Sequence, residues 1–182
     1  MNEKKLIQIV ATILNRNNGR INYTKLIKLI YLANRAFINK TGDFMIDDIL
    51  CSMKNGPVLS GLYDLIKGNY KDKEVQSVWD YFFKTESYDL CALKDVPFKE
   101  LSRAEKNILE QMESRFHDYS YQYMIDYTHK NCPEWEDTKS SSKMISDRTL
   151  YEAIGCFTKD QIEYFLSERE IYKKENQILA AL

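Results

Sequence analysis

The residues best suited to nucleophilic chemistry are a histidine and a cysteine three positions apart, His129 and Cys132. In a helix they would share one face. Pro133 follows immediately and disfavours helical backbone at Cys132. An active thiol also needs a lowered pKa, and nothing in the neighbouring sequence supplies one. We therefore do not expect catalysis at Cys132, and we expect that the chain is not an enzyme.

The sequence offers no metal-ligand pattern. The cysteines are not at zinc-finger or redox spacing, and the two histidines are not on adjacent helical turns. These residues are Cys51, Cys91, Cys132, Cys156, His117 and His129. A chain of 182 residues with four cysteines needs no disulfide framework. We expect reduced, mostly buried thiols and no bound metal.

The stretch nearest to a phosphate-binding loop is Gly56-Pro57-Val58-Leu59-Ser60-Gly61. Such loops bind anions through backbone N–H groups, and Pro57 removes one of those donors. We interpret the stretch as a tight turn that enters a helix. No nucleotide motif is present elsewhere, so we expect no cofactor.

Two other groups of residues could have either a functional or a purely structural role. Acidic residues at Asp47-Asp48 and at Glu134, Glu136 and Asp137 are suited to acid–base work, but such acids are more often solvated helix caps. A second group is aromatic and has helical spacing. It comprises Tyr119, Tyr121, Tyr123 and Tyr127. A platform for nucleobases is one interpretation, and core and interface packing is the one that we favour.

Charge disfavours nucleic acid as a partner. Lys and Arg number 26 and Asp and Glu 27, which gives a net charge of −1 and no basic excess to neutralise phosphates. Lys25, Lys28 and Arg35 could line a DNA-recognition helix, but Ile27 and Leu29 lie between them and favour burial of that helix.

The N-terminus resembles a signal peptide only in part. Lys4 and Lys5 precede an apolar run, but Gln8 and Thr12 interrupt this run and no small-residue cleavage site follows. No stretch is long enough to span a membrane. We expect a cytoplasmic protein with no membrane partner.

Apolar spacing and turn residues predict a mainly helical chain. A helix through Leu6–Leu14 should stop at Asn17-Asn18-Gly19, and a second helix should begin near Asn22 and end at Gly42. Residues 49–53 suit either a buried strand or a helical turn. A short helix with Leu62, Tyr63 and Ile66 should follow before Gly68. Val75–Phe83 and Tyr88–Leu93 are β-branched and aromatic, and they predict a β-hairpin turning at Thr85–Ser87.

The second half of the chain predicts further helices. Ser102 and Glu105 form a capping box, and so do Thr158 and Gln161, which should open a long C-terminal helix. A shorter helix should span about Tyr121 to Thr128, followed by a polar stretch over residues 129–147. His129, just past that helix, and Trp135 would form a pinned loop. This loop either covers the core or belongs to a binding surface.

Three stretches, in order, resemble the Panacea domain, the SocA-like or phage-associated GepA-like family. They are Asn22–Leu26 with Leu29–Arg35; Met53–Val58 with Tyr63–Leu65; and Leu101-Ser102 with Glu105, Tyr127–His129 and Pro133–Trp135. The chain departs from the family pattern at Asn34, where an acid is usual, and at Glu134, which separates Pro133 from Trp135.

The resemblance implies a mainly α (α+β) protein, a single helical domain with a small antiparallel β-hairpin. We expect residues 1–137 to form the Panacea core and residues 138–182 to form a polar connection and a C-terminal helix. The implied function is that of an antitoxin in a toxin–antitoxin system. It would neutralise a cognate protein toxin, encoded by a neighbouring gene, through direct protein–protein binding.

Alternatives remain open. One is a proteolytic adaptor that delivers a toxin to an ATP-dependent protease through the C-terminal helix or its Leu179–Leu182 tail. Another is a DNA-binding regulator or phage accessory protein. The sequence also leaves a homo-oligomer open. The motif positions that we expect at the partner surface are Asn55, Pro57, Tyr63, His129 and Trp135.

Overall fold

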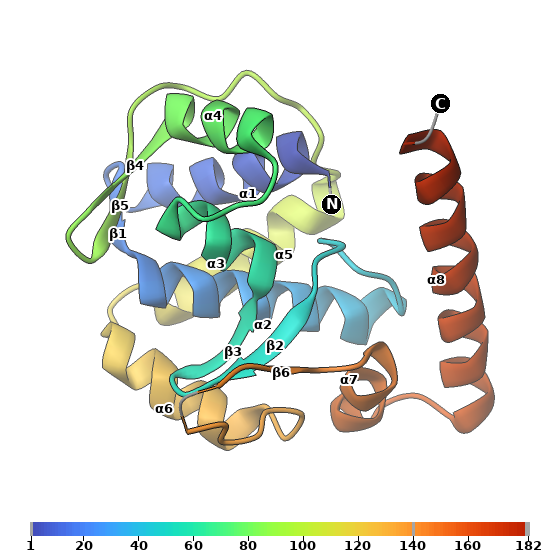
Figure 1. Ribbon diagram of the computed structural model, residues 1–182. Helices are drawn as coiled ribbons and strands as arrows, with labels where there is room; N and C mark the ends of the chain where they lie inside the picture. The colour runs from blue at the N-terminus through green and yellow to red at the C-terminus, as the bar shows by residue number, and fades with distance from the viewer. Residues whose placement is uncertain (1, 140, 181–182) are drawn as a thin grey trace.

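The computed structural model describes residues 2–139 and 141–180 (Figure 1). Its helices are α1 (Glu3–Arg16), α2 (Tyr23–Thr41), α3 (Ser60–Lys67), α4 (Lys73–Phe82), α5 (Arg103–Phe116), α6 (Tyr121–Asn131), α7 (Asp147–Ile154) and α8 (Lys159–Ala180). Its strands are β1 (Arg20–Asn22), β2 (Leu50–Met53), β3 (Gly56–Leu59), β4 (Phe83–Glu86), β5 (Asp89–Ala92) and β6 (Lys143–Met144). No helix in these residues is long and apolar enough to cross a membrane.

Helix α2 runs through the centre of the molecule, and α1, α5, α6 and β3 pack around it (Figure 1). It is buried on every side from Leu26 to Asn34, as a helix enclosed by other elements must be. Both ends were predicted correctly. Asn22 accepts hydrogen bonds from the N–H groups of Thr24 and Lys25, and Gly42 ends the helix in the left-handed conformation.

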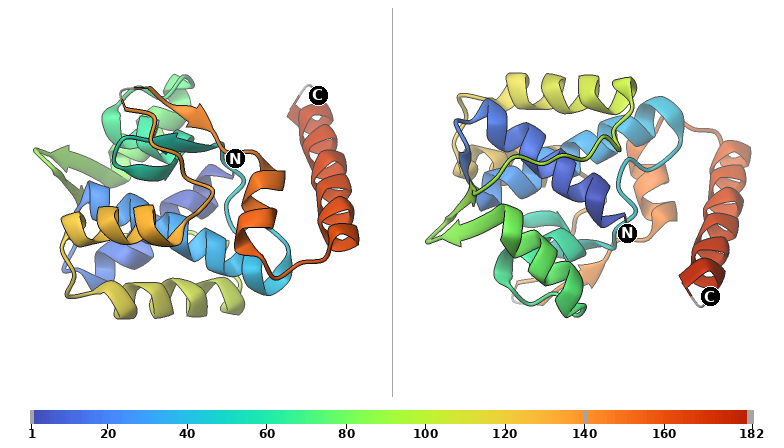
Figure 2. Two further views of the ribbon diagram at one scale, coloured as in Figure 1. Left: turned by 90° about the horizontal axis from the view of Figure 1, so that it is seen from below. Right: turned by 90° about the horizontal axis from the view of Figure 1, so that it is seen from above.

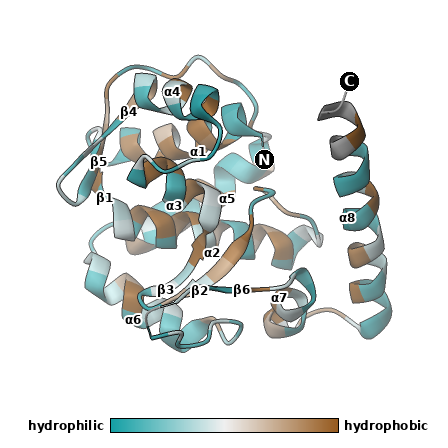
Figure 3. Cartoon of the chain, in the orientation of Figure 1, coloured by the Kyte–Doolittle hydropathy of each residue, from teal (hydrophilic) through white to brown (hydrophobic). Residues whose placement is uncertain are grey.

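The strands form two antiparallel sheets, ordered β1-β5-β4 and β3-β2-β6. The fold is therefore mixed α+β. The prediction of a single β-hairpin is wrong, because the described residues form two antiparallel sheets. The open question at residues 49–53 is answered by strand β2, which pairs Cys51 with Val58 of β3 and with Met144 of β6. Figure 3 shows apolar residues gathered in α2 and β2, where the core lies.

The predicted hairpin at residues 75–93 is shorter than expected. Its first half is helix α4, capped by Asp72, and only residues 83–86 and 89–92 pair as strands. Trp79 and Phe82 lie on the buried face of α4, three positions apart, whereas Val78 and Tyr81 are exposed. Helical periodicity thus prevailed over the β-propensity of the individual residues.

Both predicted capping boxes are present. Ser102 and Glu105 bond reciprocally at the start of α5, and Thr158 and Gln161 do so at the start of α8. Helix α6 is longer than predicted, because it continues to Asn131. His129 therefore lies in the last turn of the helix and not beyond its end.

Residues after 141 contact the rest of the molecule in different ways. Strand β6 extends the β2 sheet, and the Tyr151 hydroxyl of α7 donates to the Gly42 carbonyl at 2.7 Å. Helix α8 stands beside the body, as the two views of Figure 2 show. The predicted division between residues 137 and 138 stays a prediction.

Candidate partner-binding corner at the β2–β3 turn

Strands β2 and β3 are joined by the exposed residues Lys54 and Asn55, and Gly56 opens β3 with a φ of +96°. The backbone of Gly56 lies close to α6. A Cβ atom there would be 2.8 Å from Thr128 Oγ1 and 3.3 Å from His129 Cδ2. Glycine is thus required both for the backbone conformation and for the close approach of α6. We call this turn and the side chains packed around it the β2–β3 corner.

Lys28 of α2 lies beneath the β2–β3 corner. Its side chain is 1% exposed, and its Nζ donates to the Pro57 carbonyl at 2.8 Å. No carboxylate forms an ion pair with Lys28 within the described residues. Burial lowers the pKa of Lys28 to about 7, because the ammonium group loses its hydration.

His129 and Trp135 form the other side of the corner. Their rings stack, with centroids 3.8 Å apart and planes 7° apart. The Trp135 indole Nε1 donates to the Met53 carbonyl at 2.8 Å, which fixes the ring pair to the end of β2. Nε2 of His129 is buried, without a hydrogen-bond partner in the described part of the chain. Burial, and secondly the charge of Lys28, lowers the pKa of His129, which favours the neutral ring.

The fold brings the five sequence-predicted site residues to this corner. Asn55 is exposed at its tip, Tyr63 is half-buried on α3, and Pro57 is buried and contributes its carbonyl group. Asn55 and Tyr63 also line an open cavity of about 370 Å³ beside the turn. His129 of α6 and Trp135, which follows α6, pack against the turn. Contact with a partner at these positions stays a prediction.

A buried polar group was missed from the sequence. Glu134 accepts hydrogen bonds from the Tyr31 hydroxyl at 2.8 Å and from Arg35 Nε at 2.9 Å, and its side chain is fully buried. Arg35 also donates to the Ala153 carbonyl of α7. Burial, and then Glu134, raises the pKa of Tyr31 well above its usual range. The interpretation of Glu134 as a solvated acid is therefore wrong, because α2 supplies partners that no local sequence signal indicates.

The same contacts argue against α2 as a DNA-recognition helix. Lys25 and Lys28 are buried, and Arg35 is paired with Glu134. None of the three can reach a phosphate or a base edge without breaking these contacts.

Comparison with known protein families matches residues 26–136, more than half of the chain, to "antitoxin SocA-like, Panacea domain". The chain belongs to this family. Comparisons with curated proteins and with solved structures found no match. The matched span of the Panacea domain begins in α2 and ends one residue after Trp135, so it includes all of the β2–β3 corner.

Two departures from the usual Panacea pattern have a structural role here. Asn34 accepts a hydrogen bond from the Ile46 N–H at 3.1 Å and donates to the Ile46 carbonyl at 3.5 Å, so its amide satisfies both backbone groups. Glu134 provides the buried carboxylate for Arg35.

The predicted cap at Asp48 is present. Its carboxylate accepts hydrogen bonds from the N–H groups of Gly61 and Leu62 at the start of α3.

Cys132 of this Panacea domain is not set up as a nucleophile. Its thiol is buried, and burial, then the Glu134 carboxylate, raises its pKa to about 12. Within the described ranges, no cluster of His, Cys, Asp or Glu could hold a metal ion.

The tyrosine cluster faces solvent more than predicted. Tyr119 and Tyr123 stack at 4.1 Å and are 44% and 40% exposed, and Tyr121 is exposed as well. Of the four, Tyr127 is the one packed against the core, where its ring meets Phe116 edge-on at 4.9 Å. Core packing is thus wrong for Tyr119, Tyr121 and Tyr123, whereas packing of these exposed rings at an interface stays a prediction.

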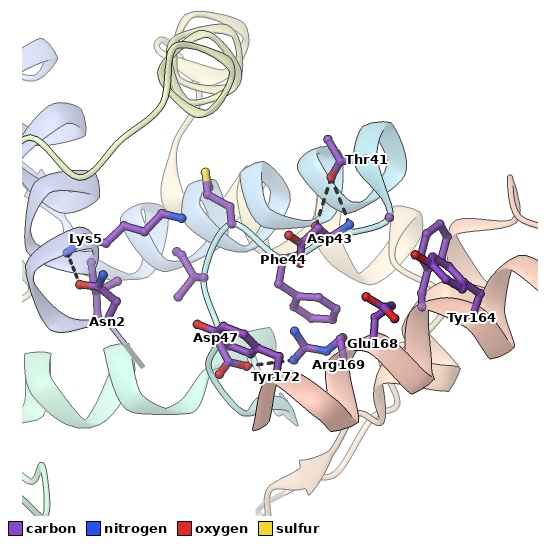
Figure 4. A pocket seen from close by; sticks show the side chains of 15 residues that line it. Asn2, Lys5, Thr41, Asp43, Phe44, Asp47, Tyr164, Glu168, Arg169 and Tyr172 are labelled. Carbon is purple, nitrogen blue, oxygen red and sulfur yellow. Dashed lines mark hydrogen bonds and ion pairs between the residues drawn. The ribbon is translucent and has the colours of Figure 1, made fainter. Parts of the chain in front are cut away.

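A second cavity, of about 490 Å³, lies outside the β2–β3 corner between α8 and the body (Figure 4). Arg169 of α8 is one of the residues that line it. Its guanidinium forms ion pairs with Asp47 at 3.0 Å and with Asp147 at 2.9 Å, and it lies 3.4 Å from the Phe44 ring centroid. Phe165 covers Gly42 so closely that a Cβ there would overlap its ring. These contacts, which we call the α8 latch, join a helix outside the matched Panacea span to the body.

Proposed function

We propose that the chain is an antitoxin that neutralises a cognate protein toxin by direct binding, and that the β2–β3 corner is part of the contact surface. The observation that carries this proposal is the family membership, because the matched family is described as SocA-like antitoxins. We expect the toxin to be encoded by a neighbouring gene and the complex to form in the cytoplasm.

The geometry of the β2–β3 corner supports binding. The two tip residues of the turn, Lys54 and Asn55, are exposed, and α6 and the stacked His129–Trp135 pair pack against the turn from behind. Asn55 and Tyr63 lie beside an open cavity. Tyr and Trp held on rigid elements are typical anchors of protein interfaces.

A non-enzymatic role agrees with the chemistry of the conspicuous side chains. The Cys132 thiol is protonated at neutral pH, and Glu134 is engaged by Tyr31 and Arg35. Binding requires none of these groups to react.

The experiment is co-expression with each neighbouring gene, scored by growth rescue and by co-purification. We expect one neighbour to be toxic alone, and its toxicity to be relieved together with a stoichiometric complex. The substitution Asn55→Glu should weaken rescue, whereas Asn69→Glu, at an exposed asparagine that does not line the cavity, should not. Absence of any toxic neighbour and of any complex would contradict the proposal.

The placement of α8 favours a second candidate, a proteolytic adaptor. This helix stands apart from the body beyond the α8 latch and exposes Tyr164, Ile171 and Tyr172. A protease contact there would leave the β2–β3 corner free for the toxin. The last two residues of the Leu179–Leu182 tail lie outside the described residues. If this tail supplies the contact, deletion of residues 174–182 should spare toxin binding and stop toxin degradation, and continued degradation would exclude the tail as the contact.

A further inference from the structure

The cavity beside the β2–β3 turn is lined by four lysines and by no acidic residue. The lysines are Lys28 of α2, Lys54 of the turn, Lys67 at the end of α3, and Lys139. The whole chain carries a net charge of −1, so this concentration of one sign is local. Positive charge around a concave site attracts an anionic group.

These lysines are not neutralised from within the protein. Across the described residues, none of the four forms an ion pair, whereas Lys5, Lys143 and Lys173 each pair with a carboxylate elsewhere. Lys67 Nζ instead donates to the Tyr23 hydroxyl at 2.6 Å and lies 5.7 Å from the Tyr63 ring centroid. The positive charge is therefore available to a ligand.

Lys28 gives the cavity a buried positive group. Its ammonium has three donors, and the Pro57 carbonyl is the one acceptor that it meets among the described residues. A buried ammonium with no carboxylate is costly, and a neighbouring anion reduces that cost. An anionic ligand would thus stabilise the protonated form of Lys28, which burial disfavours in the free protein.

The remaining walls of the cavity indicate what carries the anion. Ile27, Met53 and Val58 supply apolar surface between the lysines. A volume of about 370 Å³ is at the small end of ligand pockets and suits one or two amino-acid side chains. A nucleic-acid backbone would need an extended basic track, and the neighbouring Lys25 and Arg35 are buried or paired.

We propose that this cavity binds an acidic segment of a protein partner. An Asp or Glu carboxylate is held by Lys54, Lys67 and Lys139, and an adjacent apolar side chain packs on Ile27, Met53 and Val58. The proposal rests on the proposed antitoxin function only for identifying that partner as the toxin.

The test uses a short fluorescein-labelled peptide of alternating glutamate and leucine, and a matched peptide with glutamine in place of glutamate. Binding to the full chain is measured by fluorescence polarisation, and NMR shifts of the Asn55 and Gly56 amides locate the site. The double variant Lys54→Glu/Lys139→Glu changes two lysines at the cavity. Lys99→Glu, an exposed lysine that does not line it, is the charge control.

We expect the affinity of the glutamate peptide for the double variant to be at least about tenfold lower than its affinity for the unchanged protein. We expect the affinity of the glutamine peptide for the unchanged protein to be lower by a similar factor. Lys99→Glu should change binding less than about twofold, as expected for a distant screened charge. Equal loss with Lys99→Glu, equal binding of the glutamine peptide, or no binding at millimolar peptide would overturn the proposal. Binding of a single-stranded RNA that the double variant abolishes, with the peptide unaffected, would assign the cavity to nucleic acid instead.

This test can fail separately from the proposed function. If the double variant still rescues growth from a toxic neighbour and the peptide does not bind, the antitoxin function stands and the acidic-segment proposal falls. If the peptide binds at the cavity but no neighbour is toxic, the cavity proposal stands and the antitoxin function falls.

Discussion

The Arg35 guanidinium and the Glu134 carboxylate form an ion pair at 2.9 Å although 99 residues separate them in the chain. The pair joins the central helix α2 to the segment that carries Trp135. Since Trp135 in turn bonds Met53 at the end of β2, the ion pair helps to fix the β2–β3 corner from behind.

Replacing Glu134 by alanine should destabilise the fold by about 3–5 kcal/mol, because it leaves Arg35 and the Tyr31 hydroxyl without their acceptor. Glu134→Gln should cost less, because it keeps an oxygen that accepts a hydrogen bond. Urea unfolding measures both. Glu163→Ala, which removes an exposed partner of Arg148, is the control and should leave the midpoint unchanged. Similar effects for Glu134→Ala and Glu163→Ala would contradict the buried-pair interpretation.

Lys28 should make stability depend on pH in a predictable direction. Its pKa falls from 10.5 to about 7 on folding, so the unfolded chain binds more protons between these values. The free energy of unfolding should therefore rise with pH from about 7 towards 10.5. Relative to Lys28→Met, the gain should be about 2 kcal/mol over the first two pH units. Parallel pH profiles for the two proteins, from urea titrations, would exclude this assignment.

Gly56→Ala should be more damaging than an ordinary glycine substitution. Both Gly56 and Gly68 have positive φ, at +96° and +71°, so alanine costs about 1 kcal/mol in backbone strain at either. At Gly56 the new Cβ also meets Thr128 Oγ1 at 2.8 Å and Lys28 Nζ at 3.1 Å, whereas at Gly68 nothing lies within 4 Å. We expect a total loss of about 2–4 kcal/mol for Gly56→Ala by thermal unfolding. Equal losses for the two variants would show that α6 does not press on this turn.

Arg169→Met should release α8 from the body without unfolding the core. It removes the bonds to Asp47 and Asp147 and the contact with Phe44. Hydrogen exchange should accelerate in residues 159–173 and stay unchanged in α2. Lys174→Met, which removes an exposed pair with Glu170, is the matched control. Unchanged exchange in α8 would mean that its other contacts, including those of Phe165 and Lys173, are sufficient to hold the helix.

The α8 latch should also weaken in acid. Burial opposes ionisation of Asp147, but Lys173 and Arg169 outweigh it and hold the pKa of this carboxyl below its ordinary value of 3.8. A carboxyl group whose pKa is lower in the folded than in the unfolded state stabilises the fold at pH values above its unfolded pKa. This stabilisation is lost as the pH falls through the folded-state pKa. The protection factors of α8 amides, which are corrected for the intrinsic exchange rate at each pH, should thus fall below about pH 4 in the unmodified protein and change little in Asp147→Asn. An equal fall in both proteins would exclude Asp147 as the group responsible.

The sequence by itself determined the features that depend on neighbouring residues. The caps at Asn22 and at Ser102 with Glu105 satisfy backbone donors two or three residues away, so their pattern is visible locally. The ordered motifs also determined the family, which residues 26–136 confirm. The five motif positions proposed for the partner surface lie in two segments, residues 55–63 and 129–135, and only the tertiary structure brings these segments to one corner.

Tertiary structure decided the rest. The pattern at residues 75–82 suits a strand by propensity, and burial of Trp79 and Phe82 on one face made it a helix. Strand β6 has two residues and exists because β2 offers an edge to Lys143 and Met144. Lys28 and Glu134 look like surface charges in the sequence. Their burial depends on Pro57 and Arg35, 29 and 99 positions away, and no local spacing can indicate partners at such separations.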